Sequence, residues 1–520
     1  MPKKRPVVLL VLRPRAVGMS LFRWLYDEIR TAIIEGRLPA GARLPSTRSL
    51  ALQYRIARGT VVAAFDQLCA EEYLASSVGS GTVVREILPD RRAGAGGAVR
   101  TRERARSPRG LSARGRRLSG QPFPRLWSNH RVETFRLDRP ALDCFPMKIW
   151  SRIAARHLRK GASIGLLGAG ETLGFRPLRE AIAGYIGVSR GVKCTADQVL
   201  ITSGTQQSLD LIARLVLDAG DRVWMEDPGY TAVSVLLRAL GAEVIGVPVD
   251  AQGLDCEAPR GRARSARLAY VTAGCQFPLG VSLSLKRRLA LLRWAEEQGA
   301  WIFEDDYDSQ LSFSGRPLAA LQSLDTSGSV VYSNSFNKML FTSLRIGFLV
   351  MPAGLVKPLT AARSILDRFP SILDQATLCD FISAGYMEQH MRRMRDLYAS
   401  RFDALVRAAR SNLEGLLRLA PTHAGLQIVG WLDADMSDEE VSRRAAECGI
   451  DSVPLSRLTI DRSMPPGVVL GVGSAGTRAI HRGVKQLQGV LRKLAFERRR
   501  AELFRAAGAR NSRHQVTQPQ

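Results

Sequence analysis

A single lysine, Lys338, stands between two apolar runs of the sequence, at 330–332 and 344–351. Both runs are typical of buried strands, so we expect Lys338 in a connection between core elements rather than on a solvated face. Lost hydration favours the neutral amine, which is a nucleophile toward aldehydes. Ser335 lies three residues before Lys338 and Arg345 seven residues after it. Because a guanidinium binds phosphate through paired hydrogen bonds, these residues suit a phosphorylated aldehyde cofactor such as pyridoxal phosphate.

Two predicted strand ends carry residues that fit the same chemistry. In TSGTQQ at 202–207, Thr205 and Gln206 open a helix whose backbone amides can bind phosphate. The strand at 301–305 ends in acids followed by Tyr307. A carboxylate there can keep a pyridine nitrogen protonated, while the phenol can bond a ring hydroxyl. A solvated acidic strand end is the alternative interpretation.

A third strand end is EDPGY at 226–230, where Tyr230 could stack on a flat cofactor. Packing of this tyrosine in the core is the alternative. Lys338 taken alone would more often be an ordinary surface lysine, and the neighbouring motifs together argue against that interpretation.

The elements that must position these residues alternate between strand and helix from Phe135 onward. The predicted elements are 198–202, 206–216, 221–225, 230–240, 243–248, 267–272, 301–305 and 330–333. Such alternation predicts an α/β fold with a mainly parallel sheet and helices on both faces. The ligand site of such a fold lies at the carboxyl ends of the strands.

A separate set of residues near the N-terminus fits DNA binding. Residues 20–35 form one apolar helical stripe, and short helices follow at 46–53 and 57–70. Two short helices joined by a small turn indicate a helix-turn-helix, and strands at 72–74 and 81–84 can pair as a wing. The residues expected to contact double-stranded DNA are Ser46, Arg48, Arg58, Thr60 and Gly81. The alternative is a small helical interaction domain without DNA contact.

Composition supports a polyanionic partner. The 520 residues include 75 basic and 48 acidic side chains, a formal net charge of +27, and residues 1–135 hold 25 basic against 10 acidic, or +15. Seven cysteines form no close pair and no His/Cys cluster at metal spacing. We therefore expect a reducing cytoplasm and no metal. No window approaches the ~20 apolar residues that span a membrane.

The chain is long enough for several domains, because 45% of its residues are hydrophobic and single cores stop growing well below 520 residues. Between 91 and 117, ten arginines stand against one glutamate, which predicts a flexible linker that is either a solvated spacer or a source of extra phosphate contacts. The expected segments are an arm at 1–18, a DNA-binding domain at 19–85, the linker at 86–125, a body at 126–495 and a basic tail at 496–520, which is expected to be helical at first and disordered from 511.

Two parts of the chain resemble known families. Residues 19–85 resemble the winged helix-turn-helix of GntR-type regulators, in LFRWLYDEIRTAIIEGRLPAGARLPSTRSLA and in the GSGT wing at 79–82. The body resembles fold-type I aminotransferases in GETLGFRPLREAIAGYI, ITSGTQQSLDLIARLVLDAGDRVWMEDPGY, EDDYDS and SFNK. Their fusion is similar to the MocR subfamily, which implies a pyridoxal phosphate-binding body with a smaller C-terminal α+β subdomain. Homodimers are also implied, since fold-type I sites usually sit at subunit interfaces.

The resemblance also implies roles for single residues. Lys338 would hold the cofactor aldehyde, Asp305 would pair with the pyridine nitrogen, Tyr307 with the ring oxygen, and Tyr230 would stack on the ring. The residues implied to hold the phosphate are Thr205, Gln206, Ser335 and Arg345. Asp306 is the alternative to Asp305, and Glu304 has the spacing before the tyrosine that is usual in aminotransferases.

Several positions depart from these families. Ala57 stands where a serine commonly caps the recognition helix, which removes a hydrogen bond worth ~1 kcal/mol. Phe277 replaces an asparagine that bonds the cofactor ring oxygen, and Cys275 stands where most relatives have histidine. Val469 stands where aminotransferases carry the arginine that clamps a substrate carboxylate. Candidate substitutes for that arginine are Arg457, Arg462 and Arg478.

These observations favour a cytoplasmic DNA-binding transcription regulator that senses pyridoxal phosphate or a small amine or amino acid. Because Val469 supplies no carboxylate clamp, efficient transamination is not expected. One alternative is a working aminotransferase with an accessory DNA-binding module. A non-specific nucleic-acid binder with a vestigial second domain is another.

Overall fold

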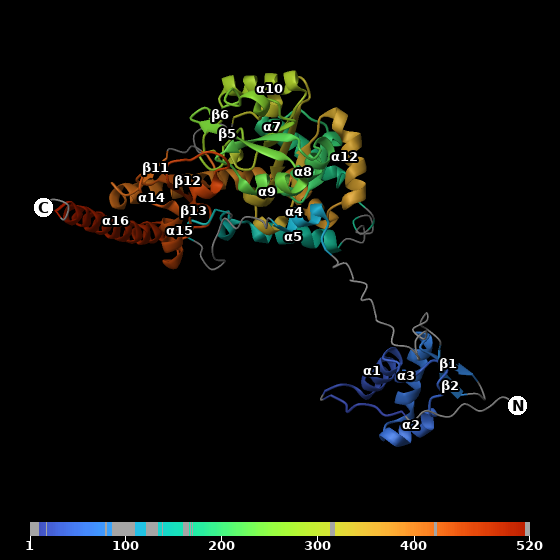
Figure 1. The fold of residues 1–520 in the computed structure, drawn as a ribbon. Helices are drawn as coiled ribbons and strands as arrows, with labels where there is room; N and C mark the ends of the chain where they lie inside the picture. Colours follow the sequence, from blue (N-terminus) through green and yellow to red (C-terminus); the bar gives the residue numbers. More distant parts are fainter. Residues whose placement is uncertain are drawn as a thin grey trace. The chain divides into compact units, whose positions relative to one another are not determined.

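The computed structural model consists of two compact units, a head over residues 1–109 and a body over residues 110–520 (Figure 1). It describes residues 10–16, 18–77, 81–85, 110–120, 134–137, 139–159, 166, 168, 170–312, 318–420 and 424–514, with side chains up to residue 500. The wing tip at 78–80 and most of the predicted linker lie outside these residues. Within them, no helix combines the length and apolarity needed to cross a bilayer.

The head is a three-helix fold with a two-stranded antiparallel wing. Its elements are α1 (Leu21–Ile34), α2 (Thr47–Tyr54), α3 (Arg58–Ala70), β1 (Leu74–Ser77) and β2 (Gly81–Val84). The Ser20 hydroxyl caps α1 by accepting from the Arg23 amide, whereas Ala57 at the start of α3 supplies no side-chain bond. The predicted helices are therefore present to within a residue or two. The first wing strand was predicted to start at Glu72 but starts at Leu74, because Glu72 has a positive φ of 65° in the turn after α3.

The predicted N-terminal arm contributes to the core of the head. Leu10 and Leu12 are buried together with Trp24 and Ile29 of α1. Tyr54 fixes this segment, because its hydroxyl donates to the Leu10 carbonyl and accepts from the Leu12 amide at 3.0 Å. Residues 10–16 therefore belong structurally to the head rather than to a separate arm.

The body is built on an eight-stranded sheet with the order β3-β10-β9-β8-β7-β4-β5-β6. The strands are β3 (Val199–Thr202), β4 (Arg222–Asp227), β5 (Glu243–Asp250), β6 (Gly253–Leu254), β7 (Leu268–Val271), β8 (Trp301–Asp305), β9 (Val330–Ser335) and β10 (Gly347–Val350). Strands β5, β4, β7, β8 and β9 run parallel, and β10 is antiparallel to both β3 and β9. The predicted mainly parallel sheet is confirmed. The strand predicted at 344–351 starts only at Gly347, because residues 342–344 form a 3₁₀ turn.

Helices cover both faces of the sheet (Figure 1). They are α5 (Met147–Arg159), α7 (Arg176–Arg190), α8 (Thr205–Val216), α9 (Thr231–Leu240), α10 (Leu285–Gln298), α11 (Phe336–Met339), α12 (Ala353–Leu366), α13 (Ile372–Ser383) and α14 (Tyr386–Asn412). Alternate residues of β4 show how the faces divide. Val223 and Met225 pack in the cluster of α8, α9 and α12, whereas Trp224 packs in the cluster of α10.

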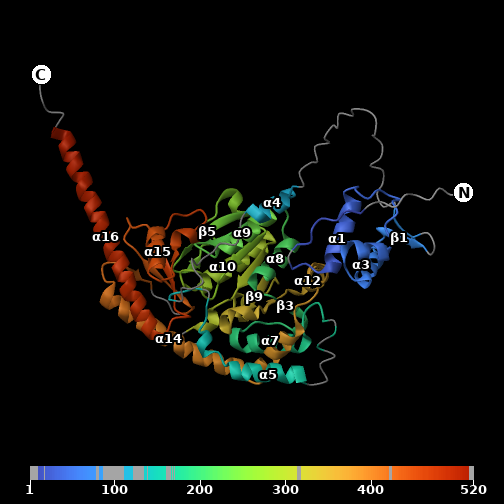
Figure 2. The ribbon, with the colours of Figure 1, turned by 90° about the horizontal axis from the view of Figure 1, so that it is seen from below.

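A smaller C-terminal subdomain contains an antiparallel sheet of order β11-β12-β14-β13. Its elements are β11 (Arg418–Leu419), β12 (Gln427–Trp431), α15 (Asp438–Glu447), β13 (Val453–Pro454), β14 (Gly467–Gly471) and α16 (Thr477–His514). The long helices α14 and α16 pack against each other (Figure 2). Helix α16 runs without a break from 477 to 514. It crosses the boundary predicted at 495, includes the helical start predicted for the tail, and contradicts the disorder predicted from 511 for residues 511–514.

A short helix, α4 (Ala113–Gly120), lies inside the segment predicted to be a flexible linker. It packs against α9 of the body, and the position that a Cβ on Gly241 would take lies 3.9 Å from the Arg117 guanidinium. Packing against another element orders a segment whose own sequence has no apolar periodicity. The prediction of a linker over 86–125 is therefore wrong for residues 113–120.

Candidate functional site

Lys338 lies where the central strand β9 passes into the single-turn helix α11. The hydroxyl of Ser335 caps this turn by accepting from the Asn337 amide at 3.3 Å. Lys338 is half-buried, its Nζ donates to the Leu137 carbonyl at 3.3 Å and lies 5.6 Å from the centre of the Tyr307 ring. The predicted connection between two core strands is thus present.

All eight residues predicted to hold the cofactor line one cavity of about 330 Å³. They are Lys338, Asp305, Tyr307, Tyr230, Thr205, Gln206, Ser335 and Arg345. The residues come from the ends of β4, β8 and β9 and from the start of α8, so the parallel sheet brings segments more than a hundred residues apart to one edge. The structure establishes this convergence, while the role of each residue stays a prediction.

The three acids at the end of β8, Glu304, Asp305 and Asp306, have different hydrogen-bond partners. The Asp305 carboxylate lines the cavity and accepts from the Tyr270 hydroxyl at 2.6 Å and the Thr205 hydroxyl at 3.1 Å. Asp306 is paired with buried Arg190 at 2.7 Å, and Glu304 accepts the backbone amides of residues 321 and 322. Asp305 is therefore the acid of this strand end that faces a ligand in the cavity.

Burial also sets the protonation of this carboxylate. Desolvation raises the pKa of Asp305 to about 6, although the bonds from Tyr270 and Thr205 favour its charged form. Glu226, at the end of β4, is buried nearby, and desolvation raises its pKa to about 7. A cationic ring nitrogen beside Asp305 would provide the positive charge that this buried carboxylate lacks.

Donor groups converge at the other end of the cavity, around Gly204. Gly204 has a positive φ of 128°, and a Cβ built on it would lie 3.2 Å from Asn337 Nδ2, 3.7 Å from Arg345 Nη2 and 3.7 Å from Ser335 Oγ. The space in front of Gly204 is thus a cradle of donors that one methyl group would fill. Helix α8 starts beside it at Thr205, so its free backbone amides add to the positive potential.

The cradle fits a phosphate. Its donors include the permanently charged guanidinium of Arg345, and the side-chain amide nitrogen of Gln206 is buried without a hydrogen-bond partner among the described residues. A phosphate offers several acceptor oxygens for such donors. With Lys338 and Asp305 in the same cavity, the residues present fit pyridoxal phosphate.

Aromatic side chains enclose the space between the cradle and the acid. Tyr230 and Phe277 contact edge to face with ring centres 5.8 Å apart, and Phe277 and Tyr307 do so at 6.4 Å. Burial raises the pKa of Tyr230 to about 12, so this phenol stays neutral. The Tyr307 hydroxyl accepts from Gln427 Nε2 at 2.7 Å, which ties the site to the C-terminal subdomain.

The sequence analysis missed several residues of the cavity. Tyr270, Asn337, Leu137, Thr272 and Thr342 line it as well. Tyr270 is the last residue but one of β7, next to β8 in the sheet, and a tyrosine near the end of a predicted parallel strand was the available signal. Leu137 had no such signal, because it reaches the cavity from a segment far from the sheet in sequence.

The wall of the cavity near Phe277 and Leu137 is apolar. Both residues belong to one buried cluster with Val469 of β14 and Val429 of β12. Val469 has an exposed fraction of 0% and stands opposite Val429 in the antiparallel ladder. The position predicted to lack a carboxylate clamp therefore lies within the apolar cluster that forms this wall.

None of the three arginines considered as substitutes for that clamp lines the cavity. Arg457 is exposed and pairs with Glu439 at 3.1 Å. Arg462 and Arg478 are also exposed, the latter in the first turn of α16.

In the head, the predicted DNA-contacting residues lie on the second and third helices and on the wing. Arg48 on α2 and Arg58 at the start of α3 are exposed, and the exposed Ser46 hydroxyl caps α2. Thr60 and Gly81 are half-buried. An exposed arginine at the start of the third helix, Arg58, is placed as direct readout of a major groove requires.

Arg43 is a further cation of the head that the sequence analysis missed. It pairs with Val83 of the wing in an isolated bridge, and its guanidinium lies 3.0 Å from the position that a Cβ on Gly81 would take. Glycine at the start of β2 therefore leaves room for this arginine. The signal was an arginine placed directly before the Leu-Pro-Ser that precedes α2.

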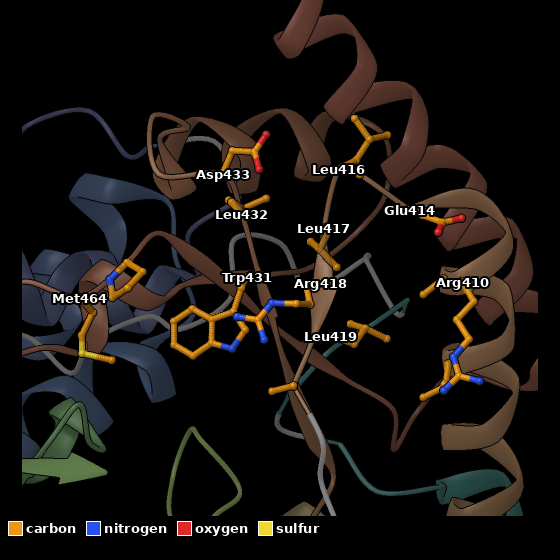
Figure 3. Close-up of a pocket in the computed structure, with 15 residues that line it drawn as sticks. Arg410, Glu414, Leu416, Leu417, Arg418, Leu419, Trp431, Leu432, Asp433 and Met464 are labelled. Carbon is orange, nitrogen blue, oxygen red and sulfur yellow. The ribbon is translucent and has the colours of Figure 1, made fainter. Parts of the chain in front are cut away.

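The body contains a larger cavity of about 1200 Å³ in the C-terminal subdomain, between the end of α14 and strands β11 and β12 (Figure 3). Its described lining is mostly apolar, with Leu416, Leu419, Trp431 and Met464 among the labelled side chains. That lining contains no lysine and none of the residues that converge around Lys338. Size alone therefore does not make it the cofactor site.

Two family models match the chain. Residues 149–461 match the model of aminotransferase class I and II, and residues 23–84 match that of bacterial regulatory proteins of the gntR family. The two matches fall on the body and on the head, in agreement with the division of the structure.

Full-length relatives share this arrangement. The probable rhizopine catabolism regulatory protein MocR of Rhizobium meliloti is 39% identical over 491 residues, covering 94% of this chain and 97% of the relative. The pyridoxine biosynthesis transcriptional regulator PdxR of Corynebacterium glutamicum is 30% identical over 451 residues, covering 86% and 91%. Among solved structures, the α-aminoadipate aminotransferase LysN of Thermus thermophilus, complexed with N-(5'-phosphopyridoxyl)-L-leucine, has 28% identity and a TM-score of 0.64. That match covers 70% of this chain and 93% of LysN.

Proposed function

Since this chain belongs to the MocR subfamily of GntR-type transcription regulators, we propose that its body binds pyridoxal phosphate at Lys338 and senses the cofactor itself or a small amine. Occupancy of the site would change the affinity of the DNA-binding head for its operator. The observation that carries the proposal is the convergence of Lys338, Asp305 and the Gly204 cradle in one cavity.

The cofactor supplies an aldehyde that captures amines covalently and a ring that withdraws electrons from the captured group. Lys338 presents its amine to that aldehyde, and Asp305 holds a proton on the pyridine nitrogen. Tyr270 and Thr205 orient the Asp305 carboxylate through their hydrogen bonds. Tyr230 would cover the ring, Tyr307 would donate to the ring oxygen, and Arg345 with Ser335 and the start of α8 would hold the phosphate.

The direct test is reduction of the cofactor-loaded full-length protein with borohydride, followed by peptide mapping. We expect a phosphopyridoxyl group on Lys338 and on none of the other nine lysines of the chain. The matched control is the reduced protein without added cofactor. Labelling of a different lysine would refute the assignment of the site.

Regulation is tested by titrating fluorescent DNA from the region upstream of the gene with the protein, with and without pyridoxal phosphate and candidate amines. If the site is a sensor, the ligand shifts the DNA affinity, and DNA must shift the ligand affinity by the same factor. A random duplex of equal length is the control. Equal affinity for both duplexes at physiological salt would instead favour a non-specific binder.

We further propose a homodimer that acts in the cytoplasm, where bacterial DNA is found. Two heads would read two half-sites, which a single head cannot do. Light scattering of the purified protein should give twice the mass of 57.0 kDa expected for one chain. A monomer at micromolar concentration that still binds its operator specifically would contradict this part of the proposal.

The competing function is a working aminotransferase, which the presence of Lys338 and Asp305 in one cavity favours. The apolar wall around Val469 argues against it, because an α-amino acid would lack its usual charged partner. Steady turnover of an amino acid with an oxo-acid by the full-length protein, lost in a Lys338→Ala variant, would establish the enzyme.

A further inference from the structure

The charges around the cavity restrict what the body can sense. Among the described residues that line it, the only lysine and arginine side chains are Lys338 and Arg345. Under the proposed function both are engaged, because Lys338 holds the cofactor aldehyde and Arg345 lies at the phosphate cradle beside Gly204. Among the described residues of the cavity, a carboxylate on the sensed molecule would therefore find no cation that is not already used.

The part of a ligand that points away from the phosphate would meet a hydrophobic wall of the cavity. Leu137 and Phe277 line it, and Val469 and Val429 pack directly behind them with side chains that are fully buried. A carboxylate placed against this wall would lose its hydration without gaining a counter-charge, which is strongly unfavourable. A neutral or apolar substituent would instead bury its surface there.

Nearby arginines serve a different cavity. Arg136 and Arg139 flank Leu137 in sequence but line a neighbouring cavity, beside Phe341. They are not among the residues that line the cavity of Lys338. A carboxylate attached to the carbon next to the sensed amine would have to lie close to Lys338, so it would face the hydrophobic wall rather than these arginines.

We propose that the amine sensed by this regulator carries no carboxylate on the carbon next to its nitrogen. This inference rests on the proposed function and narrows it, since it excludes ordinary α-amino acids and selects primary amines with a neutral substituent. The selectivity arises from the hydrophobic wall. Behind that wall, Val469 stands at the position predicted to carry a carboxylate-binding arginine in aminotransferases.

The test compares two probes that differ by one carboxylate, 1-aminopropane and L-2-aminobutyrate. The full-length protein loaded with pyridoxal phosphate is titrated with each, and the absorbance of the bound cofactor reports binding. The same titrations with free pyridoxal phosphate correct for the different basicity of the two amines. After this correction we expect 1-aminopropane to bind at least about tenfold more tightly, because the carboxylate of L-2-aminobutyrate would lose its hydration without gaining a counter-charge. Equal or tighter binding of L-2-aminobutyrate would overturn the inference.

A pair of variants tests the wall itself. Val469→Arg should raise the affinity for L-2-aminobutyrate relative to 1-aminopropane, whereas Val469→Met, which adds length without charge, should not. An unchanged preference in a folded Val469→Arg protein would show that this wall does not exclude carboxylates. If Val469→Arg fails to fold, the unmodified protein and its two probes still decide the question.

The two levels of the proposal fail in different ways. If borohydride does not label Lys338, the cofactor site is wrong and amine selectivity has no basis. If Lys338 is labelled but L-2-aminobutyrate is preferred, the cofactor site stands and only the inference about the sensed amine is wrong.

Discussion

The head and the body place their functional residues in opposite ways. In the head, Arg48 and Arg58 are exposed on neighbouring helices only a few residues apart in sequence. In the body, Asp305 is buried, and it meets Thr205 and Lys338 only because the sheet brings distant strand ends together. A substitution in the head should therefore change binding with little effect on folding. In the body, a substitution of a buried cavity residue such as Asp305 should change both ligand binding and stability.

The largest expected effect is that of Lys338→Ala in the body. The variant should lose all covalently held pyridoxal phosphate, because no other described lysine lines the cavity. The DNA-binding head should keep the affinity of the cofactor-free protein, since it folds around its own core. Absorbance after gel filtration and DNA anisotropy measure the two properties. Lys357→Ala, which removes an exposed lysine of α12, is the control.

Arg58→Ala in the head should have the opposite effect, with DNA binding weakened and cofactor binding retained. Loss of an exposed arginine at the start of α3 should weaken specific DNA binding by about 1 to 3 kcal/mol, or roughly fivefold to more than a hundredfold, through lost base contacts. Cofactor absorbance should not change. Arg23→Ala removes an equal charge from α1, where it pairs with Asp27 at 3.1 Å, and controls for net charge. An operator footprint unaffected by Arg58→Ala would show that the recognition helix is assigned wrongly.

Gly204→Ala should weaken cofactor binding in the body. Its φ of 128° lies in a region that is nearly exclusive to glycine, at a cost of about 1 to 3 kcal/mol for alanine, and the new methyl would fill the phosphate cradle. We expect an affinity for pyridoxal phosphate lower by at least about tenfold in a fluorescence titration. Gly184→Ala on α7 meets open space and is the control. Equal affinities of both variants would locate the phosphate elsewhere.

The same contrast explains what the sequence could predict. The helices of the head follow from local apolar periodicity and capping at Ser20 and Ser46, so their bounds were predicted to within a residue or two. The residues predicted for the cofactor site of the body were chosen from predicted strand ends, from their spacing to Lys338 and from the family resemblance, and they line one cavity. The sequence did not show which acid faces the cavity. Asp306 is turned away from it by a buried ion pair with Arg190, and the two residues are 116 positions apart, so no local pattern reveals the pair.

Tertiary packing also explains the errors. The arginine-rich sequence of helix α4 has no apolar periodicity that would predict a helix. The helix packs against α9, which lies far from it in sequence. Helix α16 packs against α14 and α15 through residues of its first half and runs on across the domain boundary predicted at 495. Leu137 enters the cavity from a segment that forms no strand of the main sheet. These features depend on neighbours that are distant in sequence.

Burial of Asp305 predicts that the stability of the body depends on pH. Its pKa is raised to about 6, above the ~3.9 of a free side chain, so the folded state binds more protons than the unfolded state between these values. Its contribution should therefore lower the free energy of unfolding as pH rises from about 4 to 6, by on the order of 2 kcal/mol. The measurement is urea unfolding of the cofactor-free protein and of Asp305→Asn at several pH values. We expect the unmodified protein to lose stability relative to Asp305→Asn as pH rises from about 4 to 6. A rise in its free energy of unfolding relative to that of Asp305→Asn would contradict the raised pKa.

The smallest effect is expected from Ala57→Ser in the head. Ala57 precedes α3 with extended backbone angles and supplies no side-chain bond to the free amides of the first turn. A serine hydroxyl there should accept one of them and stabilise the head by ~1 kcal/mol. Thermal unfolding followed by the Trp24 signal measures this gain, with Ala57→Val, which adds bulk without an acceptor, as the control. Because the new cap is local and exposed, cofactor affinity of the body should stay constant. A change in that affinity would show that the two units are coupled through the start of the recognition helix.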